Sequence, residues 1–245
     1  MAKREATPPI WVLPEPPERN WGLGRPEIVR AAVRLADAGE GGGDAPPMRA
    51  IAKELGASTP MSLYRYVHNK DGLLDLMLDA ANAEVPTPER PGDDWRAELA
   101  VLAADMWAMT KRHPWFARLV HQRPPVGPHA SRREEFVLAT FHRLGQDLHT
   151  AHRYARLVEG HVIGQALQWA DERRMWQNNA IGGVDDARRQ ARSWFPENGD
   201  AHPLVDRARN DFLTATTPPV DENAQFDLGL ACLLDGIANR LPQHG

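Results

Sequence analysis

The sequence has almost no cysteine and no long apolar run. Cys232 is the only cysteine among 245 residues, so no disulfide can form within the chain, which fits a reducing compartment. No run approaches the roughly eighteen apolar residues of a membrane-spanning helix, and the N-terminus lacks the apolar core of a signal peptide. We therefore expect a cytoplasmic protein with no membrane partner.

A strand pattern is also missing. No segment alternates apolar and polar residues with the two-residue period of a β-strand, whereas helical spacing recurs along the chain. The apolar content of 42% is ordinary for a globular protein, and a net charge of −4 argues against bulk attraction to nucleic acid. We expect an all-α fold of one large or two modest domains.

Motifs for catalysis and metal binding are scarce. The ten histidines include His142, His149 and His152, which could share one helical side, but no carboxylate completes a zinc set such as H-E-x-x-H. No glycine–serine nucleophile elbow occurs, and Cys232 lies in an apolar helix without a nearby histidine. We expect no catalytic residue, metal or cofactor. An all-α metal-dependent enzyme that uses the histidines stays open as an alternative.

The most informative stretch is Pro47 to Lys70, PMRAIAKELGASTPMSLYRYVHNK. It predicts two short helices joined by a tight turn, because apolar residues recur at helical spacing on both sides of Gly56. A glycine there can take the positive φ that ends a helix. Thr59 should cap the second helix with its hydroxyl, and Pro60 suits the first helical position.

The second helix of this pair has the composition of a recognition helix. Leu63 and Val67 face inward, which leaves tyrosines, Arg65 and small polar groups on the outer side. Four cations stand against Glu54 alone between residues 47 and 70, so the local charge is positive. Asn69 should cap the next helix. Lys70 at its start has no favourable interaction with the helix dipole, and a phosphate partner would explain it.

Several strings around this pair resemble the DNA-binding domain of TetR-family transcriptional regulators. They are LYRYV followed by NK and LLDLML, preceded by EIVRAAVRLADAG and MRAIAKELG, over about residues 25 to 85. One departure is the turn from Gly56 to Tyr64, which is one residue longer than the family's usual spacing. The predicted contacts to double-stranded DNA are Arg49, Thr59, Met61, Ser62, Tyr64, Arg65, Tyr66 and Lys70. Tyr64, Tyr66 and Lys70 are expected on phosphates, and Ser62 and Arg65 near base edges.

We expect four parts in this chain: an irregular arm (1–24), a helix-turn-helix DNA-binding domain (25–70), a connector helix (71–85) and a C-terminal domain (86–245). Trp11 and Trp21 either dock the arm on the body or lie in a disordered tail, and DNA contact through Lys3, Arg4, Arg19 and Arg25 is the alternative. The connector should run unbroken from Asn69 to about Val85, with Asp71, Asp75 and Asp79 on its solvent side. The segment VPTPERPGD marks the boundary that follows.

The remainder predicts helices at about 93–112, 131–148, 151–175, 184–195, 203–214 and 222–241. The string HPWFARL resembles the C-terminal domain of TetR-type regulators, which implies a small-molecule pocket and a four-helix bundle between subunits. The matching bundle helices are 151–175, where Gly160 and Gly164 favour close backbone approach, and 222–241. Candidate ligand contacts are Trp107, Trp115, His142, Gln165 and Trp169, although aromatic residues at helical spacing are more often core.

Together these features predict a ligand-responsive transcriptional regulator, a repressor that binds a palindromic operator as a homodimer. A small-molecule effector would move the connector helix and release the DNA. The alternatives are the metal-dependent enzyme above and a DNA-binding regulator that has no small-molecule effector.

Overall fold

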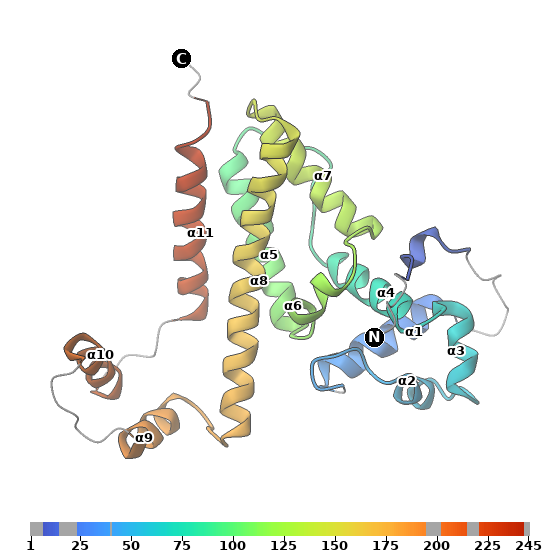
Figure 1. Ribbon diagram of the computed structural model, residues 1–245, viewed down its shortest axis with the longest axis horizontal. Coiled ribbons are helices and arrows are strands. Elements are labelled where there is room, and N and C mark those ends of the chain that lie inside the picture. The colour runs from blue at the N-terminus through green and yellow to red at the C-terminus, as the bar shows by residue number, and fades with distance from the viewer. Residues whose placement is uncertain (1–6, 15–23, 40, 195–201, 215–220, 243–245) are drawn as a thin grey trace, which may run out of the picture. The chain divides into compact units, whose positions relative to one another are not determined.

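The computed structural model describes residues 7–14, 24–39, 41–194, 202–214 and 221–242 (Figure 1). These ranges contain no β-strand, so the predicted all-α class is confirmed. The α-helices are α1 (Arg25–Asp37), α2 (Met48–Glu54), α3 (Pro60–Val67), α4 (Lys70–Asn82), α5 (Trp95–Arg112), α6 (Phe116–Leu119), α7 (Pro128–Arg143), α8 (Leu148–Asn178), α9 (Val184–Trp194), α10 (Pro203–Thr214) and α11 (Glu222–Ala238). Two 3₁₀ helices, η1 (Ile10–Val12) and η2 (Val120–Gln122), complete the set.

The chain forms two compact units. One comprises residues 1–167 and 230–245, and the other comprises residues 168–229. Helices α1 to α7 belong to the first unit, α9 and α10 belong to the second, and α8 and α11 each contribute to both. The boundaries that the sequence suggests near residues 70 and 86 divide the chain by expected function, and the compact units do not follow them. This division into functional domains stays a prediction.

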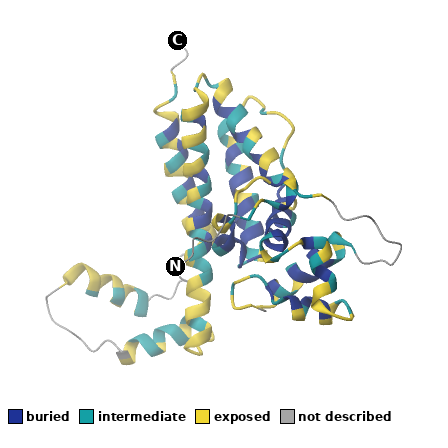
Figure 2. Ribbon diagram, turned by 45° about the vertical axis from the view of Figure 1, so that its right-hand side comes forward, coloured by how far each residue is buried: buried dark blue, intermediate teal, exposed yellow. Residues whose placement is uncertain are grey.

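Helices α1 to α4 form the N-terminal helical group (Figure 1). Figure 2 shows buried residues in dark blue on these helices. Ile28 of α1, Ile51 of α2, Leu63 of α3 and Leu73 of α4 are each fully buried. Burying such a side chain stabilises the fold by about 1.5–3 kcal/mol, so these contacts hold the short α2 and α3 in place.

Helix α4 is more deeply buried than its sequence pattern predicts. Asp75 and Asp79 were expected on the solvent side, but each is only 5% exposed, so this prediction is wrong for both. The reason is tertiary, because α4 packs against η1, α6 and α7 as well as α1. Donors from η1 and from Arg123 in the loop before α7 reach Asp75, and donors from the start of α7 reach Asp79.

The described part of the N-terminal arm docks on the body. Ile10 is fully buried and its backbone N–H donates to Asp75 Oδ2 at 2.9 Å, while neighbouring Trp11 is half-buried. Docking is thus found for Trp11, one of the two alternatives that the sequence left open. Trp21, Lys3, Arg4 and Arg19 lie outside the described residues.

The break between α7 and α8 falls earlier than predicted. Helix α7 ends at Arg143, because Gly145 takes a φ of +79° and the N–H of Gln146 donates back to Phe141 O. Asp147 then caps α8, where its Oδ1 accepts from the N–H of Thr150 at 2.9 Å. Helix α8 consequently starts three residues before the position expected from the sequence.

Candidate DNA-binding surface and effector cavity

The turn between α2 and α3 is set by backbone geometry. Gly56 has a φ of +63°, as predicted, and the N–H of Ala57 donates to Ala52 O at 2.8 Å to close α2. Helix α3 begins at Pro60. Thr59 precedes it in an extended conformation but its side chain makes no capping bond, so the predicted hydroxyl cap is wrong. Instead, Ser62 Oγ donates to Thr59 O at 2.6 Å.

The outer face of α3 carries the residues expected to read DNA. Leu63 and Val67 are fully buried, which fixes the rotation of the helix. Among the eight predicted contacts, the side chains fall into two groups by exposure. Arg49, Thr59, Met61, Arg65 and Lys70 are exposed, whereas Ser62, Tyr64 and Tyr66 are half-buried.

This face is positively charged because its acid is already paired. Glu54 Oε1 forms an ion pair with Arg34 Nη2 of α1 at 3.0 Å. Among the described residues, no carboxylate forms an ion pair with Lys53 or with the predicted DNA contacts Arg49, Arg65 and Lys70. The surface of α2, α3 and the start of α4 is therefore an uncompensated cationic patch of the kind that phosphates attract.

The junction from α3 to α4 places Lys70 on this patch. His68 has a φ of +60°, and the N–H of Asn69 donates to Val67 O at 2.7 Å, which makes a very tight turn. The predicted cap is confirmed, since Asn69 Oδ1 accepts from the N–H of Gly72 at 2.8 Å. A side chain on Gly72 would overlap Val67 O, so the close approach of the two helices requires glycine there.

The structure also shows a contact between α1 and α3 that the sequence did not predict. Arg25, at the first position of α1, donates from Nε to Tyr66 O at 2.9 Å. Its position next to Pro26 gave no sign of this role, since the bond joins residues 41 apart.

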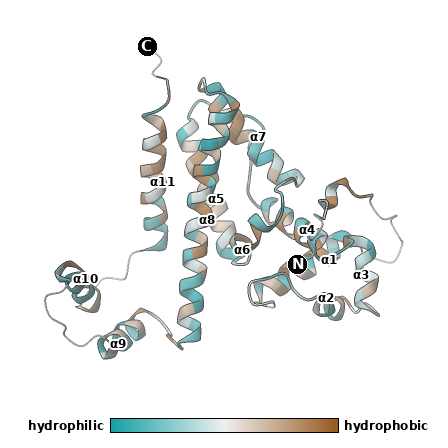
Figure 3. Cartoon of the chain, in the orientation of Figure 1, coloured by the Kyte–Doolittle hydropathy of each residue, from teal (hydrophilic) through white to brown (hydrophobic). Residues whose placement is uncertain are grey.

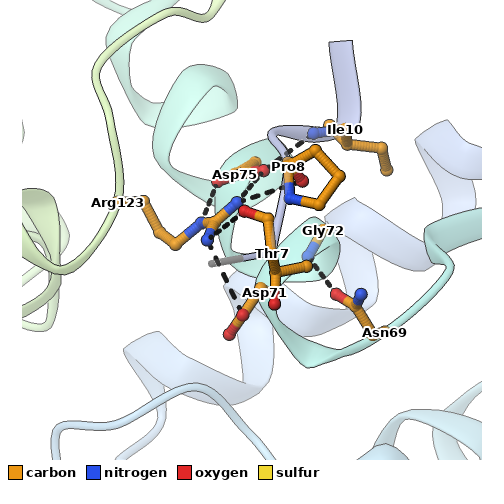
Figure 4. A network of polar contacts seen from close by, with 8 residues as sticks. All are labelled: Thr7, Pro8, Ile10, Asn69, Asp71, Gly72, Asp75 and Arg123. Atoms are coloured by element: carbon orange, nitrogen blue, oxygen red, sulfur yellow. Dashed lines mark hydrogen bonds and ion pairs between the residues drawn. The ribbon is translucent and has the colours of Figure 1, made fainter. Parts of the chain in front are cut away.

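Figure 4 shows the polar network that anchors α4 to the N-terminal segment. Arg123, in the loop before α7, donates from Nε to Asp75 Oδ1 at 2.6 Å and from Nη2 to Asp75 Oδ2 at 3.0 Å. Its Nη1 donates to Thr7 O at 3.2 Å. The hydrogen bonds to Asp75 raise the pKa of the guanidinium above its ordinary value, while burial opposes them. This arginine therefore joins the arm, α4 and the loop that leads into α7.

A second polar cluster joins α1 to the corner between α5 and α6. Asp37, the last residue of α1, accepts at Oδ1 from Trp115 Nε1 at 2.7 Å and lies 2.8 Å from His113 Nδ1. The other ring nitrogen of His113 lies 2.9 Å from Glu84, just after α4. Burial raises the pKa of Glu84, but hydrogen bonds from His113 and Arg112 outweigh it and leave that pKa below its ordinary value. We call Asp37, Glu84, His113 and Trp115 the Asp37 cluster.

A cavity of about 320 Å³ lies between α5, α7 and α8. Its wall is mostly apolar and comprises Leu102, Ala103 and Met106 of α5, Pro125, Ala130 and Val137 in and before α7, and Ala155 and Val158 of α8. Five polar side chains complete the lining, namely Arg133, Glu134, His152, Arg156 and Glu159. An apolar space with a few placed polar groups is typical of small-molecule sites.

The cavity is linked to α4 through α7. Arg133 of α7 lines the cavity and donates from Nη1 to Asn82 Oδ1 at the end of α4. Asp79 accepts from the N–H groups of His129 and Ala130 at 3.0 and 3.2 Å, and so caps the start of α7. A side chain on Gly127 would overlap the Asp79 carboxylate, so α7 approaches α4 closely at this point.

None of the five ligand contacts predicted from the sequence lines this cavity. Trp107 and Trp115 are buried in the core, and His142 is exposed with Nδ1 3.1 Å from Gln146 O. Gln165 and Trp169 are half-buried on α8, where Trp169 Nε1 donates to Glu222 Oε2 at 2.6 Å. Sequence reasoning missed Arg133 because a charged residue on a helix is normally solvated. A ligand role for the five stays an untested prediction.

In the described parts of the chain, no group of three or more histidine, cysteine, aspartate or glutamate side chains could hold a metal ion. No helix in those same ranges is long and apolar enough to cross a membrane.

The fold and these two features define a class: a helix-turn-helix DNA-binding protein whose cationic surface is joined by α4 to a helical body with a cavity. The sequence model of the family described as "Tetracyclin repressor-like, C-terminal domain" matches residues 87–241 of this chain. An HTH-type transcriptional regulator of Saccharopolyspora erythraea is 36% identical over 232 residues, which cover 94% of this chain and 91% of the relative.

The HTH-type transcriptional repressor DrrR1 of Streptomyces coeruleorubidus is 40% identical over 140 residues, which cover 57% of this chain and only about half (51%) of DrrR1. The structure is similar to that of ActR, a Streptomyces coelicolor TetR family protein in complex with (S)-DNPA, with a TM-score of 0.68 and 25% identity over 90% of this chain and 99% of ActR. The chain belongs to the TetR family of transcriptional regulators. The predicted class, a TetR-type helix-turn-helix transcriptional regulator, is confirmed.

Proposed function

We propose that this regulator is a repressor that binds a palindromic operator as a homodimer and releases it when a small molecule enters the cavity between α5, α7 and α8. DrrR1 is named as a repressor and ActR has been crystallised with a small molecule, which supports the analogy. Such a protein acts where the DNA is, so the cytoplasm is part of the proposal. A DNA-binding regulator without an effector is the second candidate.

The observation that carries the effector part of this proposal is the position of Arg133. The residue faces the cavity and holds Asn82 of α4 at the same time. A ligand that draws the guanidinium away would loosen α4, on which Lys70 and the α3 junction depend. Release of DNA requires that the ligand binds more tightly to the arrangement of α4 that does not fit the operator.

The dimer part of the proposal concerns the outer faces of α8 and α11. Val158, Val162 and Ala166 of α8 are buried within the chain, but Leu157 is 50% exposed. Gly160 and Gly164 are exposed, and no described atom beyond their chain neighbours and the adjacent backbone of α8 lies within 4 Å of where their side chains would begin.

Hydrophobic residues also recur along α11 (Figure 3), and a groove of about 650 Å³ is lined by residues of α8 and α11 that include Leu157 and Leu233. An isologous pairing of these faces would bury that groove, and a two-fold protein suits a two-fold operator.

Replacing Leu157 by glutamate should convert the dimer to a monomer, because it would bury two unpaired charges at the two-fold seam. Sedimentation at micromolar concentration measures the change. The matched control is Val101→Glu on α5, which is 61% exposed and away from the proposed seam, so it should leave the dimer intact. Monomeric unmodified protein would contradict the dimer directly. Ile237 of α11 is unsuitable for this test because it is 2% exposed within its own chain.

On DNA, Lys70 and Arg65 should act differently. Lys70→Ala should weaken binding to all sequences about equally and lower the log–log salt slope by about 0.9 per subunit, since one phosphate contact is lost. Arg65→Ala should relax preference at one base pair of each half-site, at a cost of about 1–3 kcal/mol. Half-sites should lie about 34–36 Å apart or a multiple of this.

Gel-shift titrations over a salt series, on operator and on scrambled DNA, measure these effects. Arg90→Ala is the control, because Arg90 is exposed in the segment before α5 and outside the cationic patch. If all three variants keep the affinity, slope and preference of the unmodified protein, α3 does not present its recognition surface on this side.

A further inference from the structure

One cation of the cavity lacks a counter-ion. Arg133 is 8% exposed, and its Nη1 donates to the neutral amide oxygen of Asn82. Among the described residues no carboxylate forms an ion pair with it. Burying an unpaired charge is costly, so a guanidinium in this position favours any anion that can reach it.

The carboxylates nearest to the cavity already have other partners. Glu159 Oε2 forms an ion pair with Arg156 Nη1 at 2.5 Å, and Glu134 Oε1 lies 3.3 Å from His152 Nδ1. Asp79 accepts from two backbone N–H groups at the start of α7. These three carboxylates therefore act on Arg133 from a distance rather than by contact.

The electrostatics of Arg133 agree with this geometry. Burial lowers the pKa of its guanidinium from the ordinary value, and Glu159, Asp79 and Glu134 oppose that change. Because arginine stays protonated in proteins, the group remains a cation in an apolar wall. Leu102, Met106 and Val158 surround the rest of the space.

We infer that the effector is a hydrophobic acid, whose carboxylate or comparably acidic oxygen pairs with Arg133 while its apolar body fills the space beside α5 and α8. This inference rests on the proposed function, since it names the chemistry of the ligand that enters the same cavity. One of the five N–H donors of the guanidinium is engaged with Asn82, so the others can hold a carboxylate through two parallel hydrogen bonds.

Matched pairs of probes test this chemistry. Each pair is an aromatic acid and its primary amide, for which we choose 3-phenylpropanoic, 2-naphthoic and anthraquinone-2-carboxylic acids to span the cavity's size. Calorimetric titration of the full dimeric protein gives the dissociation constants. The best acid should bind about 10- to 100-fold more tightly than its amide, because a charge-assisted hydrogen bond is worth about 1.5–3 kcal/mol.

Variants at Arg133 assign this preference to the residue. Arg133→Met keeps much of the side-chain volume without the charge and should make the acid and its amide bind equally. Arg132→Met, at the exposed neighbouring position on α7, should keep the preference of the unmodified protein. Arg133→Lys retains a cation but not the paired donors, so it should show a reduced preference, and it carries the test should Arg133→Met fail to fold.

The inference is overturned if no acid binds more tightly than its amide, weak binding of every probe included, or if the preference survives in Arg133→Met. Operator binding by the ligand-free protein is measured in parallel. If the protein binds its operator but shows no preference for acids, only this inference fails. If it binds no operator, the proposed function fails whatever the probes do.

Discussion

Arg123→Met should lower the free energy of unfolding by about 3–5 kcal/mol, the cost of removing one partner from a buried ion pair. The side chains of Arg123 and Asp75 are only 9% and 2% exposed, and they are joined by two hydrogen bonds. Without the guanidinium, the Asp75 carboxylate stays buried with the N–H of Ile10 as its remaining donor. Urea unfolding, compared with that of Arg132→Met, measures the loss.

The double variant Arg123→Met with Asp75→Asn should recover much of this stability. Asparagine removes the buried charge but keeps an oxygen that can accept from the N–H of Ile10. Hydrogen exchange gives a second readout, because the Ile10 amide should lose protection in the single variant and regain it in the double one. A loss below about 1 kcal/mol in the single variant would mean that water replaces Arg123 at Asp75, and the network of Figure 4 would then be peripheral.

Asp37→Ala should cost about 2–4 kcal/mol, since it leaves two donors without an acceptor. His113 and Trp115 are 5% and 2% exposed, so water cannot readily satisfy either group in place of the carboxylate. Asp37→Asn keeps an acceptor for the indole N–H and should cost less than alanine. Thermal and urea unfolding give these values, and Glu89→Ala, at an exposed site before α5, is the control.

A consequence for DNA binding follows from the position of the Asp37 cluster. Asp37 ends α1, whereas His113 and Trp115 lie at the α5–α6 corner, so the cluster ties the N-terminal helices to the body. The Asp37→Ala variant should therefore also bind operators whose half-sites are moved by one base pair, because its two recognition helices are held less rigidly. Equal stability, or an unchanged spacing preference in a folded variant, would show that the cluster does not set this distance.

Much of the N-terminal half could be predicted from local sequence. Helical spacing placed Leu63 and Val67 inward, and each is fully buried. Gly56 and Asn69 act at the helix ends where the sequence placed them, because positive φ and a side-chain cap are properties of a few neighbouring residues. The prediction that Thr59 caps α3 was wrong, and its side chain makes no hydrogen bond to the free amides there.

The candidate effector site could not be predicted in the same way. Periodicity separates an inner from an outer side of a helix but does not tell which neighbours cover the outer side. On α8, Leu157 and Val158 are both apolar and adjacent, yet Leu157 is exposed and Val158 is buried in the chain. On α7 nothing in the spacing of Arg133 marks it as the buried cation of a cavity.

The sequence alone determined the all-α class, the helix-turn-helix pair and its positive surface, because those depend on apolar spacing and on residues close together in the chain. Only the tertiary structure decided that Asp75, Asp79 and Arg133 are buried, and which groups satisfy them. Their partners lie about 50 residues away or more, at Arg123, His129 and Asn82. A charged residue looks solvent-facing until a distant donor or acceptor removes the cost of its burial, and that encounter exists only once the helices have packed.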